Sequence, residues 1–361
     1  ETEDTLLSAG LFGGRLVCHY LRHAQSVLQV RGLDGETVAA IELPDAVSVT
    51  EITGRPGSSR VHFATTSYLQ SGAIWSHDLD TGRTEVVTPS AADFDADRFV
   101  TEQVFVESAD GTAVPMFLTR PRSLEPTGDA AVILYGYGGF NVPMTPGFSG
   151  TFAAWLDRGG VLAVANLRGG GEYGRAWHDA GRLARKQNVF DDFAACARWL
   201  SSSGWSRPDR TAIMGGSNGG LLVGASITQH PELFGAALAE VGVMDMLRFH
   251  LFTIGWAWKS DYGDPQIEEQ FDWIRAYSPL HNVRPGECYP PTLIMTGDHD
   301  DRVVPAHSYK FAATLQQAQG CEHPILLRVA TSAGHGAGKP TAKLIDEAAD
   351  RLAFLDAAFR L

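Results

Sequence analysis

The chain has 361 residues, of which 44% are hydrophobic and 20% are charged, as in an ordinary globular protein with room for two domains. Its formal net charge of −13 argues against nucleic acid or an anionic membrane surface as a partner, because both attract basic surfaces. No apolar stretch of about 18 residues is present, so no transmembrane helix is expected.

The start of the chain and its cysteines indicate the cellular compartment in which the protein is expected. The chain begins with Glu1 rather than Met, and no basic start followed by an apolar run marks a signal peptide. We therefore expect a cytoplasmic protein whose N-terminal part is incomplete. The four cysteines are widely spaced and form no CxxC pair: Cys18, Cys196, Cys288 and Cys321. This pattern favours a reducing compartment, and we expect no disulfide framework, no metal site and no organic cofactor.

Residues 1–94 have the pattern of short strands separated by turns. Strands are expected at 15–20, 27–32, 38–43, 61–67, 74–78 and 84–88. Two similar turns, LDGET at 33–37 and LDTGRT at 79–84, recur at a spacing close to the roughly 40–50 residues of a β-propeller blade. We predict a partial propeller of about two blades, although propellers usually have roughly 4–8. An ordinary antiparallel sheet is the alternative.

Residues 95–361 have a pattern in which strands alternate with helices. Strands are expected at 104–108, 116–119, 131–135, 161–166, 211–214, 236–241 and 292–296. Helices are expected at 191–203, 308–319 and 341–361, with a further helix that ends at 229. This alternation predicts an α/β domain with a mostly parallel sheet and helices on both faces.

The segment TAIMGGSNGGLLV, at 211–223, places the motif G-x-S-x-G between an expected strand and an expected helix. A nucleophile elbow requires this setting, because small residues at Gly215 and Gly219 let the backbone turn sharply. The backbone N–H of Asn218 then lies at a helix N-terminus, where it can stabilise an oxyanion. A phosphate-binding loop would need a Lys that is not there. Ser217 is therefore the predicted nucleophile of a serine hydrolase.

An acid and a base are expected after Ser217, in that order along the chain. The expected strand 292–296 runs into GDHDDRVVP, which offers Asp298, Asp300 and Asp301; Asp298 follows a Gly and suits a turn. His335 lies in the Gly-rich loop TSAGHGAGKP, and its imidazole can take the Ser217 proton and return it to a leaving amine. His299 is the alternative base, although its position beside the acids suits a structural role.

Several segments together resemble the prolyl oligopeptidases, the S9 serine peptidases. They are Tyr135-Gly-Tyr137-Gly-Gly-Phe140, Asn166-Leu-Arg168-Gly-Gly-Gly-Glu172-Tyr173-Gly, Gly-Gly-Ser217-Asn218-Gly-Gly, Val241-Gly-Val243-Met-Asp245, Asp300-Asp301-Arg302-Val303-Val-Pro and Gly-His335-Gly-Ala-Gly-Lys-Pro. The similarity runs from about residue 100 to the C-terminus. It implies an α/β-hydrolase catalytic domain at 95–361, and residues 1–94 look like the last blades of the family's propeller.

The resemblance also implies the parts of a catalytic machinery. Ser217, Asp300 and His335 match the family's triad, which selects Asp300 among the three acids. The Tyr137 hydroxyl and the Asn218 backbone N–H match its oxyanion hole. A phenol suits that role, because its O–H can point at a developing alkoxide.

A substrate pocket follows from the same resemblance. Trp258 matches the indole that stacks on the substrate proline, and only the resemblance selects it over the neighbouring Trp256. The walls of the apolar pocket match Phe140, Val243, Tyr262 and Val303. Arg302 matches a residue that hydrogen-bonds a substrate carbonyl. An aromatic platform suits proline, whose ring is a flat apolar disc without an amide N–H.

The predicted function is a serine endopeptidase that hydrolyses short peptides on the carboxyl side of proline through an acyl-enzyme intermediate. Its expected partners are short proline-containing peptides. Basic-residue or acylaminoacyl specificity, or esterase activity, stays open, because Asp261 and Asp264 near Trp258 could serve a basic substrate.

A further alternative comes from the propeller. The family has a full propeller preceded by a short piece of the catalytic domain, whereas this chain carries about two blades. The alternative to an enzyme is therefore a binding role, in which an inactive fragment binds the missing N-terminal part of the same enzyme.

Overall fold

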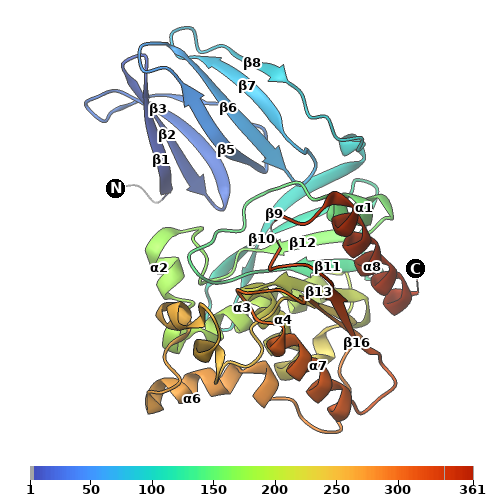
Figure 1. Cartoon of the computed structure of the whole chain (residues 1–361). Helices are drawn as coiled ribbons and strands as arrows, with labels where there is room; N and C mark the ends of the chain where they lie inside the picture. The colour runs from blue at the N-terminus through green and yellow to red at the C-terminus, as the bar shows by residue number, and fades with distance from the viewer. Residues whose placement is uncertain (1–3, 337, 361) are drawn as a thin grey trace.

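The structure is a computed structural model that describes residues 4–336 and 338–360; Ala337 and Leu361, which fall in two predicted segments, lie outside it. The chain begins with two four-stranded antiparallel sheets, each in sequential strand order (Figure 1). The first contains β1 (Thr5–Phe12), β2 (Arg15–Arg22), β3 (Gln25–Arg31) and β4 (Thr37–Ile41). The second contains β5 (Val47–Gly54), β6 (Arg60–Ser67), β7 (Ala73–Asp78) and β8 (Thr84–Thr88).

These two sheets are the predicted propeller blades. The sequence missed the first strand of each, β1 and β5. Both strands carry an irregularity in register, at Leu6/Ser8 and at Val49/Glu51, which interrupts the alternation of apolar and polar residues. Apolar side chains of the two blades form one cluster: Phe12, Val17, Leu28, Val30, Ile41, Val49, Val61 and Phe63.

The third sheet has eight strands in the order β16-β15-β14-β13-β11-β12-β10-β9. Its strands are β9 (Phe99–Glu107), β10 (Ala113–Pro121), β11 (Val132–Tyr135), β12 (Val161–Ala165), β13 (Thr211–Gly216), β14 (Ala236–Glu240), β15 (Thr292–Gly297) and β16 (Ile325–Ala330). The six strands from β12 to β16 in this order pair in parallel. Strand β10 pairs antiparallel with both β12 and β9.

Helices cover both faces of this sheet. Residues of α1 (Gly150–Asp157) and α8 (Thr341–Phe359) share one apolar cluster, and those of α3 (Gln187–Ser202), α4 (Asn218–Gln229) and α7 (Ala306–Ala318) share the other (Figure 1). Shorter helices are α2 (Gly174–Asp179), α5 (Lys259–Tyr262) and α6 (Glu268–Tyr277). Along β13, Ala212 and Met214 face the first cluster and Ile213 faces the second. This is the predicted α/β-hydrolase architecture.

Blades and sheet meet through polar and apolar contacts. The His23 ring, at the turn between β2 and β3, hydrogen-bonds the Tyr173 hydroxyl through Nδ1 at 2.8 Å. Tyr68 packs against Phe117 of β10 with the ring centroids 5.6 Å apart.

The predicted division between residues 94 and 95 stays a prediction. In the described residues no helix is both long and apolar enough to cross a membrane.

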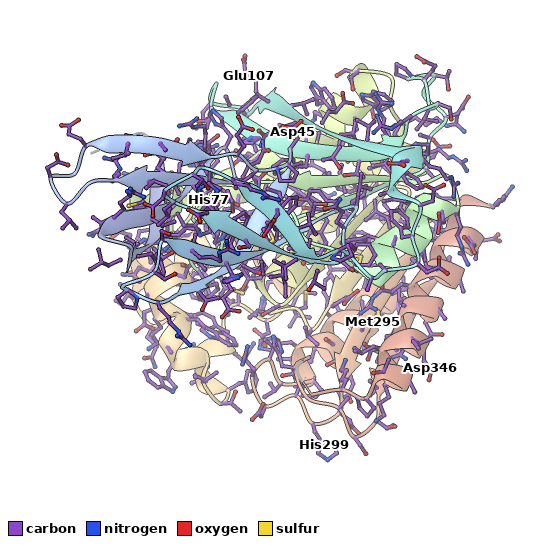
Figure 2. The ribbon with its side chains drawn as sticks, turned by 90° about the horizontal axis from the view of Figure 1, so that it is seen from above. Asp45, His77, Glu107, Met295, His299 and Asp346 are labelled. Atoms are coloured by element: carbon purple, nitrogen blue, oxygen red, sulfur yellow. A yellow bond between two sulfur atoms is a disulfide. The ribbon has the colours of Figure 1, made fainter. Side chains whose placement is uncertain are left out.

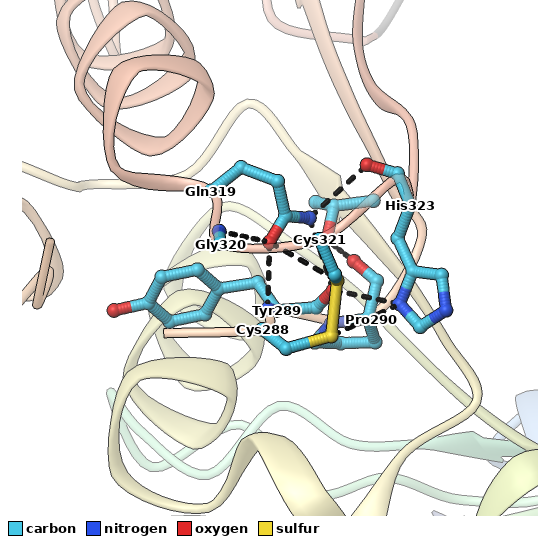
Figure 3. Close-up of a disulfide and its surroundings, with 8 residues drawn as sticks. Cys288, Tyr289, Pro290, Gln319, Gly320, Cys321 and His323 are labelled. Carbon is cyan, nitrogen blue, oxygen red and sulfur yellow. Dashed lines mark hydrogen bonds between the residues drawn. A yellow bond between two sulfur atoms is a disulfide. The ribbon is translucent and has the colours of Figure 1, made fainter. Parts of the chain in front are cut away.

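The expectation about the cysteines was wrong for one pair. Cys288 and Cys321 form a disulfide with their Cα atoms 5.1 Å apart (Figure 3). Cys288 precedes β15 and Cys321 precedes β16, and these adjacent parallel strands bring two distant sequence positions together. His323 lies close enough for a three-ligand metal cluster, but sulfurs joined to each other do not serve as thiolate ligands. Cys18 and Cys196 are free and buried.

Candidate active site

Ser217 sits at the sharp turn between β13 and α4. Its backbone has φ 58° and ψ −116°, a strained conformation for a residue with a side chain. Small neighbours are required, because a Cβ on Gly215 would lie 2.5 Å from the Gly219 carbonyl oxygen. The Ser217 N–H donates to the Glu240 carbonyl at 2.8 Å, which ties the turn to β14. This geometry is that of a nucleophile elbow.

Tyr137 and Asn218 lie beside this turn. The Ser217 side chain lies close enough to the Tyr137 phenol to influence its pKa, which it lowers. Burial raises the pKa of Tyr137, and Asp261 adds to the shift, so the phenol keeps the proton that a donor needs. Asn218 is the first residue of α4, where the backbone N–H groups have no partner within the helix.

The predicted acid and base are brought together from two different loops. His335 Nδ1 lies 2.7 Å from Asp300 Oδ2. The other oxygen, Oδ1, accepts the N–H groups of Arg302 and Val303 at 3.0 and 2.9 Å, so the carboxylate is fixed in orientation. His299, the alternative base, instead pairs with Asp298 at 2.7 Å and points out from the rim of the molecule (Figure 2).

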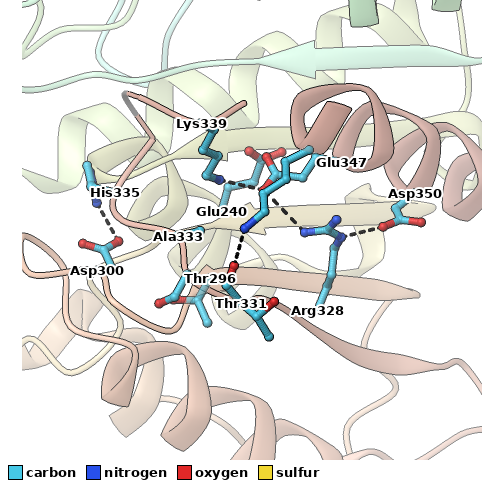
Figure 4. A network of polar contacts seen from close by, with 12 residues as sticks. Glu240, Thr296, Asp300, Arg328, Thr331, Ala333, His335, Lys339, Glu347 and Asp350 are labelled. Carbon is cyan, nitrogen blue, oxygen red and sulfur yellow. Dashed lines mark hydrogen bonds and ion pairs between the residues drawn. The ribbon is translucent and has the colours of Figure 1, made fainter. Parts of the chain in front are cut away.

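An ion-pair network holds the loop that carries His335 (Figure 4). Lys339 Nζ donates to Glu347 Oε1 of α8 at 2.7 Å, and Lys343 Nζ donates to the Thr331 carbonyl at 2.6 Å. Arg351 of α8 forms two hydrogen bonds with Glu240, at 2.6 and 2.8 Å. Because the Ser217 N–H also bonds Glu240, the network links the histidine loop to the elbow.

The predicted pocket residues form an aromatic cluster in part. Phe140 contacts Tyr262 edge-on with the ring centroids 5.3 Å apart. Phe249 contacts Tyr262 edge-on at 5.4 Å and stacks on Trp258 at 6.3 Å. Val243 and Val303 belong to the buried core that Phe140 and Trp258 border. By contrast, Trp256 is 65% exposed.

Arg302 is exposed and adds a positive charge near Tyr137. Among the described residues its guanidinium forms no ion pair, and the nearby Asp298 pairs with His299 instead. Its backbone N–H bonds Asp300, so its position is fixed by the acid that it follows.

Both acids near Trp258 are already paired. Asp261 is 2% exposed and accepts hydrogen bonds from the Phe140 N–H at 3.2 Å and from His178 Nε2 at 2.7 Å. Asp264 accepts from Lys259 Nζ at 2.8 Å, and this hydrogen bond is the main cause of its lowered pKa.

Sequence reasoning missed several residues behind the site. Lys186, His178 and Phe249 are far from Ser217 along the chain, and no motif marks them. Only the structure shows that Lys186, just before α3, has 1% side-chain exposure, and a buried lysine requires partners. A hollow of about 1320 Å³ lies elsewhere, at the amino ends of the strands beside Pro290 and Phe354, and none of the predicted site residues lines it.

A mostly parallel sheet with a serine at a strand–helix elbow places the chain in the α/β-hydrolase class. The family model described as "Prolyl oligopeptidase family" matches residues 146–361, and that of the "Prolyl oligopeptidase, N-terminal beta-propeller domain" matches residues 1–90. The chain belongs to the prolyl oligopeptidase family.

Curated relatives agree with this assignment. The prolyl endopeptidase of Elizabethkingia miricola is 44% identical over 343 residues, which cover 95% of this chain and 49% of the relative. That of Elizabethkingia meningoseptica is 43% identical over 356 residues, 98% of this chain and 50% of the relative. The dual function macrocyclase-peptidase POPB of Galerina marginata is 44% identical over 326 residues, which cover 88% of this chain and 45% of the relative.

Solved structures superpose over the whole chain. A prolyl endopeptidase studied for inter-domain dynamics in catalysis and specificity gives a TM-score of 0.96 at 44% identity, covering 100% of this chain and 53% of that one. Substrate-bound prolyl oligopeptidase B from Galerina marginata gives a TM-score of 0.93 at 39% identity. The match covers 100% of this chain and 52% of that one. The chain thus spans about half the length of the relatives that it matches.

Proposed function

We propose that this protein is a serine endopeptidase that cleaves short peptides after proline through an acyl-enzyme. The observation that carries the proposal is the hydrogen bond of 2.7 Å between His335 Nδ1 and Asp300 Oδ2, which offers an oriented base. The strained turn that presents Ser217 between β13 and α4 supports it by offering a nucleophile. The names of the relatives support the choice of a prolyl bond.

The proposed reaction follows from the roles of these groups. His335 takes the Ser217 proton as the serine oxygen attacks the carbonyl carbon, and Asp300 stabilises the imidazolium. The Tyr137 O–H and the Asn218 N–H donate to the resulting oxyanion. The leaving amine then takes the proton from His335, and water hydrolyses the acyl-enzyme by the same steps.

The proposed pocket uses Phe140, Trp258 and Tyr262 as aromatic surfaces for the proline ring, closed by Val243 and Val303. Arg302 is proposed to bond a substrate carbonyl. A basic side chain would need a free carboxylate, but Asp261 and Asp264 are each engaged by other groups. These contacts favour a prolyl substrate over an arginyl or lysyl one.

The activity of the whole enzyme and its other partners also belong to this proposal, because the chain covers about half of its relatives. Short proline-containing peptides are the proposed substrates. We further propose that the N-terminal part of such an enzyme, where present, completes the cleft with the remaining blades.

Hydrolysis of a Z-Gly-Pro chromogenic substrate by the purified 361-residue chain tests the proposal, with Ser217→Ala as the control. The expected result is turnover that disappears in the variant. A matched Z-Gly-Arg substrate should give far less product. Preferential cleavage of the arginyl substrate would contradict the pocket assignment. A folded chain that reacts with neither substrate would contradict activity of this chain alone.

A further inference from the structure

The loop 137–140, which carries Tyr137, has an unusual backbone. Gly138 has φ 64°, and the side-chain-bearing Phe140 and the following Asn141 both have φ 56°. Such conformations are unfavourable for a residue that carries a Cβ, and they persist only where the surroundings impose them. The loop also cannot relax toward the elbow, because a Cβ on Gly139 would lie 2.6 Å from Asn218 Nδ2. Contacts from outside the loop must therefore hold it.

Three side chains hold three of its backbone groups. Asn218 Nδ2 donates to the Tyr137 carbonyl at 2.5 Å, and Lys186 Nζ donates to the Gly138 carbonyl at 2.8 Å. On the other side of the loop, the Phe140 N–H donates to Asp261 Oδ2 at 3.2 Å. The three side chains come from the start of α4, the residue before α3 and the short helix α5.

These side chains are also joined to one another. Lys186 Nζ donates to Asn218 Oδ1 at 3.2 Å, and the Tyr262 hydroxyl donates to the same oxygen at 2.9 Å. The Lys186 ammonium lies 3.9 Å from Asp261 Oδ1, and His178 Nε2 contacts Asp261 Oδ2 at 2.7 Å. One connected cluster thus touches both proposed oxyanion donors, the Tyr137 loop and Asn218.

Stability alone does not account for this cluster. Lys186 and Asp261 are both buried, and burial lowers the pKa of Lys186 to about 8 while Asp261 opposes the shift. Asp261 Oδ1 has no hydrogen-bond partner within the described residues. A buried pair with incomplete hydrogen bonding often stabilises a fold less than apolar residues of the same volume would. The contacts of the pair with the loop 137–140 instead indicate that it fixes the geometry of that loop.

We infer that Lys186 and Asp261, with His178 as the support of Asp261, are positioning residues that set the oxyanion hole through the backbone of the loop 137–140. The inference rests on the proposed function, since it deepens the role of Tyr137 and Asn218. Lys186 and Asp261 fix the carbonyl of Gly138 and the N–H of Phe140, and this holds the backbone that directly follows Tyr137 and so the direction of the Tyr137 side chain.

The test compares the full chain with Lys186→Met, Asp261→Asn and the double variant. Active sites are counted by titration with a fluorophosphonate, so that kcat refers to reactive Ser217 only. We expect each single variant to lower kcat per titrated site by about 10- to 100-fold, with KM changed less than about threefold, because an oxyanion donor acts mainly on the transition state.

The double variant separates positioning from charge balance. It removes both buried charges, so its melting temperature should recover relative to Lys186→Met, whereas its kcat should stay low. Recovery of kcat together with the melting temperature would overturn the inference. So would a kcat per titrated site that stays within about twofold of the parent in the single variants while only the melting temperature falls.

Two further variants keep the test decisive. Lys310→Met removes another lysine that pairs with a buried carboxylate, Asp245, and should lower the melting temperature without changing kcat per titrated site. If Lys186→Met does not fold, His178→Gln, which withdraws one contact of Asp261, should lower kcat about threefold. An unchanged kcat in that variant would contradict the inference.

The rate of Ser217 phosphonylation distinguishes this inference from the proposed function. That reaction also builds negative charge on an oxygen in the oxyanion hole, and it needs no proline. If the parent fails to cleave the prolyl substrate but Lys186→Met slows phosphonylation, the function fails and the positioning role stands. Equal phosphonylation rates in parent and variant overturn the positioning role.

Discussion

His335 and Asp300 share a hydrogen bond of 2.7 Å, and the Asp300 oxygen that does not bond His335 accepts two backbone N–H groups. The carboxylate therefore selects the His335 tautomer with a proton on Nδ1, which leaves Nε2 free to accept a proton from Ser217. This relationship leads to the first prediction.

Asp300→Asn should lower kcat by about 10³- to 10⁴-fold with a small change in KM, because an amide can favour the wrong imidazole tautomer. The measurement is steady-state hydrolysis of the prolyl substrate. Asp298→Asn is the matched control, since the Asp298 carboxylate bonds the exposed His299 and the Ala333 N–H rather than His335. Equal losses in the two variants would contradict the assignment of the acid.

Tyr137→Phe should lower kcat by about 10- to 1000-fold, because it removes one hydrogen bond made to the oxyanion in the transition state. KM should change little, and the melting temperature should stay near that of the parent. The effect should be visible in single-turnover acylation as well as in steady state. A variant with raised KM and normal kcat would show that Tyr137 binds substrate instead.

Trp258→Ala should lower kcat/KM for the prolyl substrate by about 3- to 10-fold, the equivalent of about 1 kcal/mol of ring contact. Trp256→Ala is the control, because that indole is 65% exposed and lies two residues away on the same turn, Gly255–Trp258. The sequence could not choose between the two indoles without a family resemblance. If Trp256→Ala has the larger effect, the choice is reversed.

Glu172 makes stability depend on pH. Burial raises its pKa from 4.5 to about 7, so between these values the folded protein holds a proton that the unfolded chain has released. Unfolding releases that proton, and the free energy of unfolding therefore falls as pH rises through the window. Glu172→Gln should stabilise the protein by up to about 3 kcal/mol more at pH 8 than at pH 5, as measured by urea unfolding.

Reduction of the Cys288–Cys321 disulfide should lower the free energy of unfolding by about 4 kcal/mol, because the bond closes a loop between residues 33 positions apart. Urea unfolding with and without a dithiol reductant measures the change. A Cys288→Ser/Cys321→Ser variant should be insensitive to the reductant.

Periodicity and motifs predicted much of the fold. Buried strands such as β11 and β13 were found because both of their faces are apolar, and the elbow was found because Gly215 and Gly219 flank Ser217. Strand β16 was missed, since its middle residues, Leu326 among them, are partly exposed at the edge of the sheet. Helix α6 was missed as well, although Glu268 and Glu269 mark its first turn.

The surroundings of the site were harder to predict than its reactive groups. Ser217 has a local signature, but Lys186 and Asp261 meet only because α3 and α5 converge on one loop. The pairing of Cys288 with Cys321 likewise depends on the order of β15 and β16 in the sheet. Contacts of this kind are set by topology, which one-dimensional spacing does not contain.

The position of β13 has a consequence for how the protein loses function. This strand is hydrogen-bonded on both sides, by β11 and β14, whereas the loop around His335 is fastened largely through side chains such as Lys339. Amide protons of Ile213 and Met214 should exchange only on global opening, and those near His335 by local fluctuation. Mild denaturant should then silence the enzyme while its central sheet is intact, so residual activity reports the anchoring of one loop.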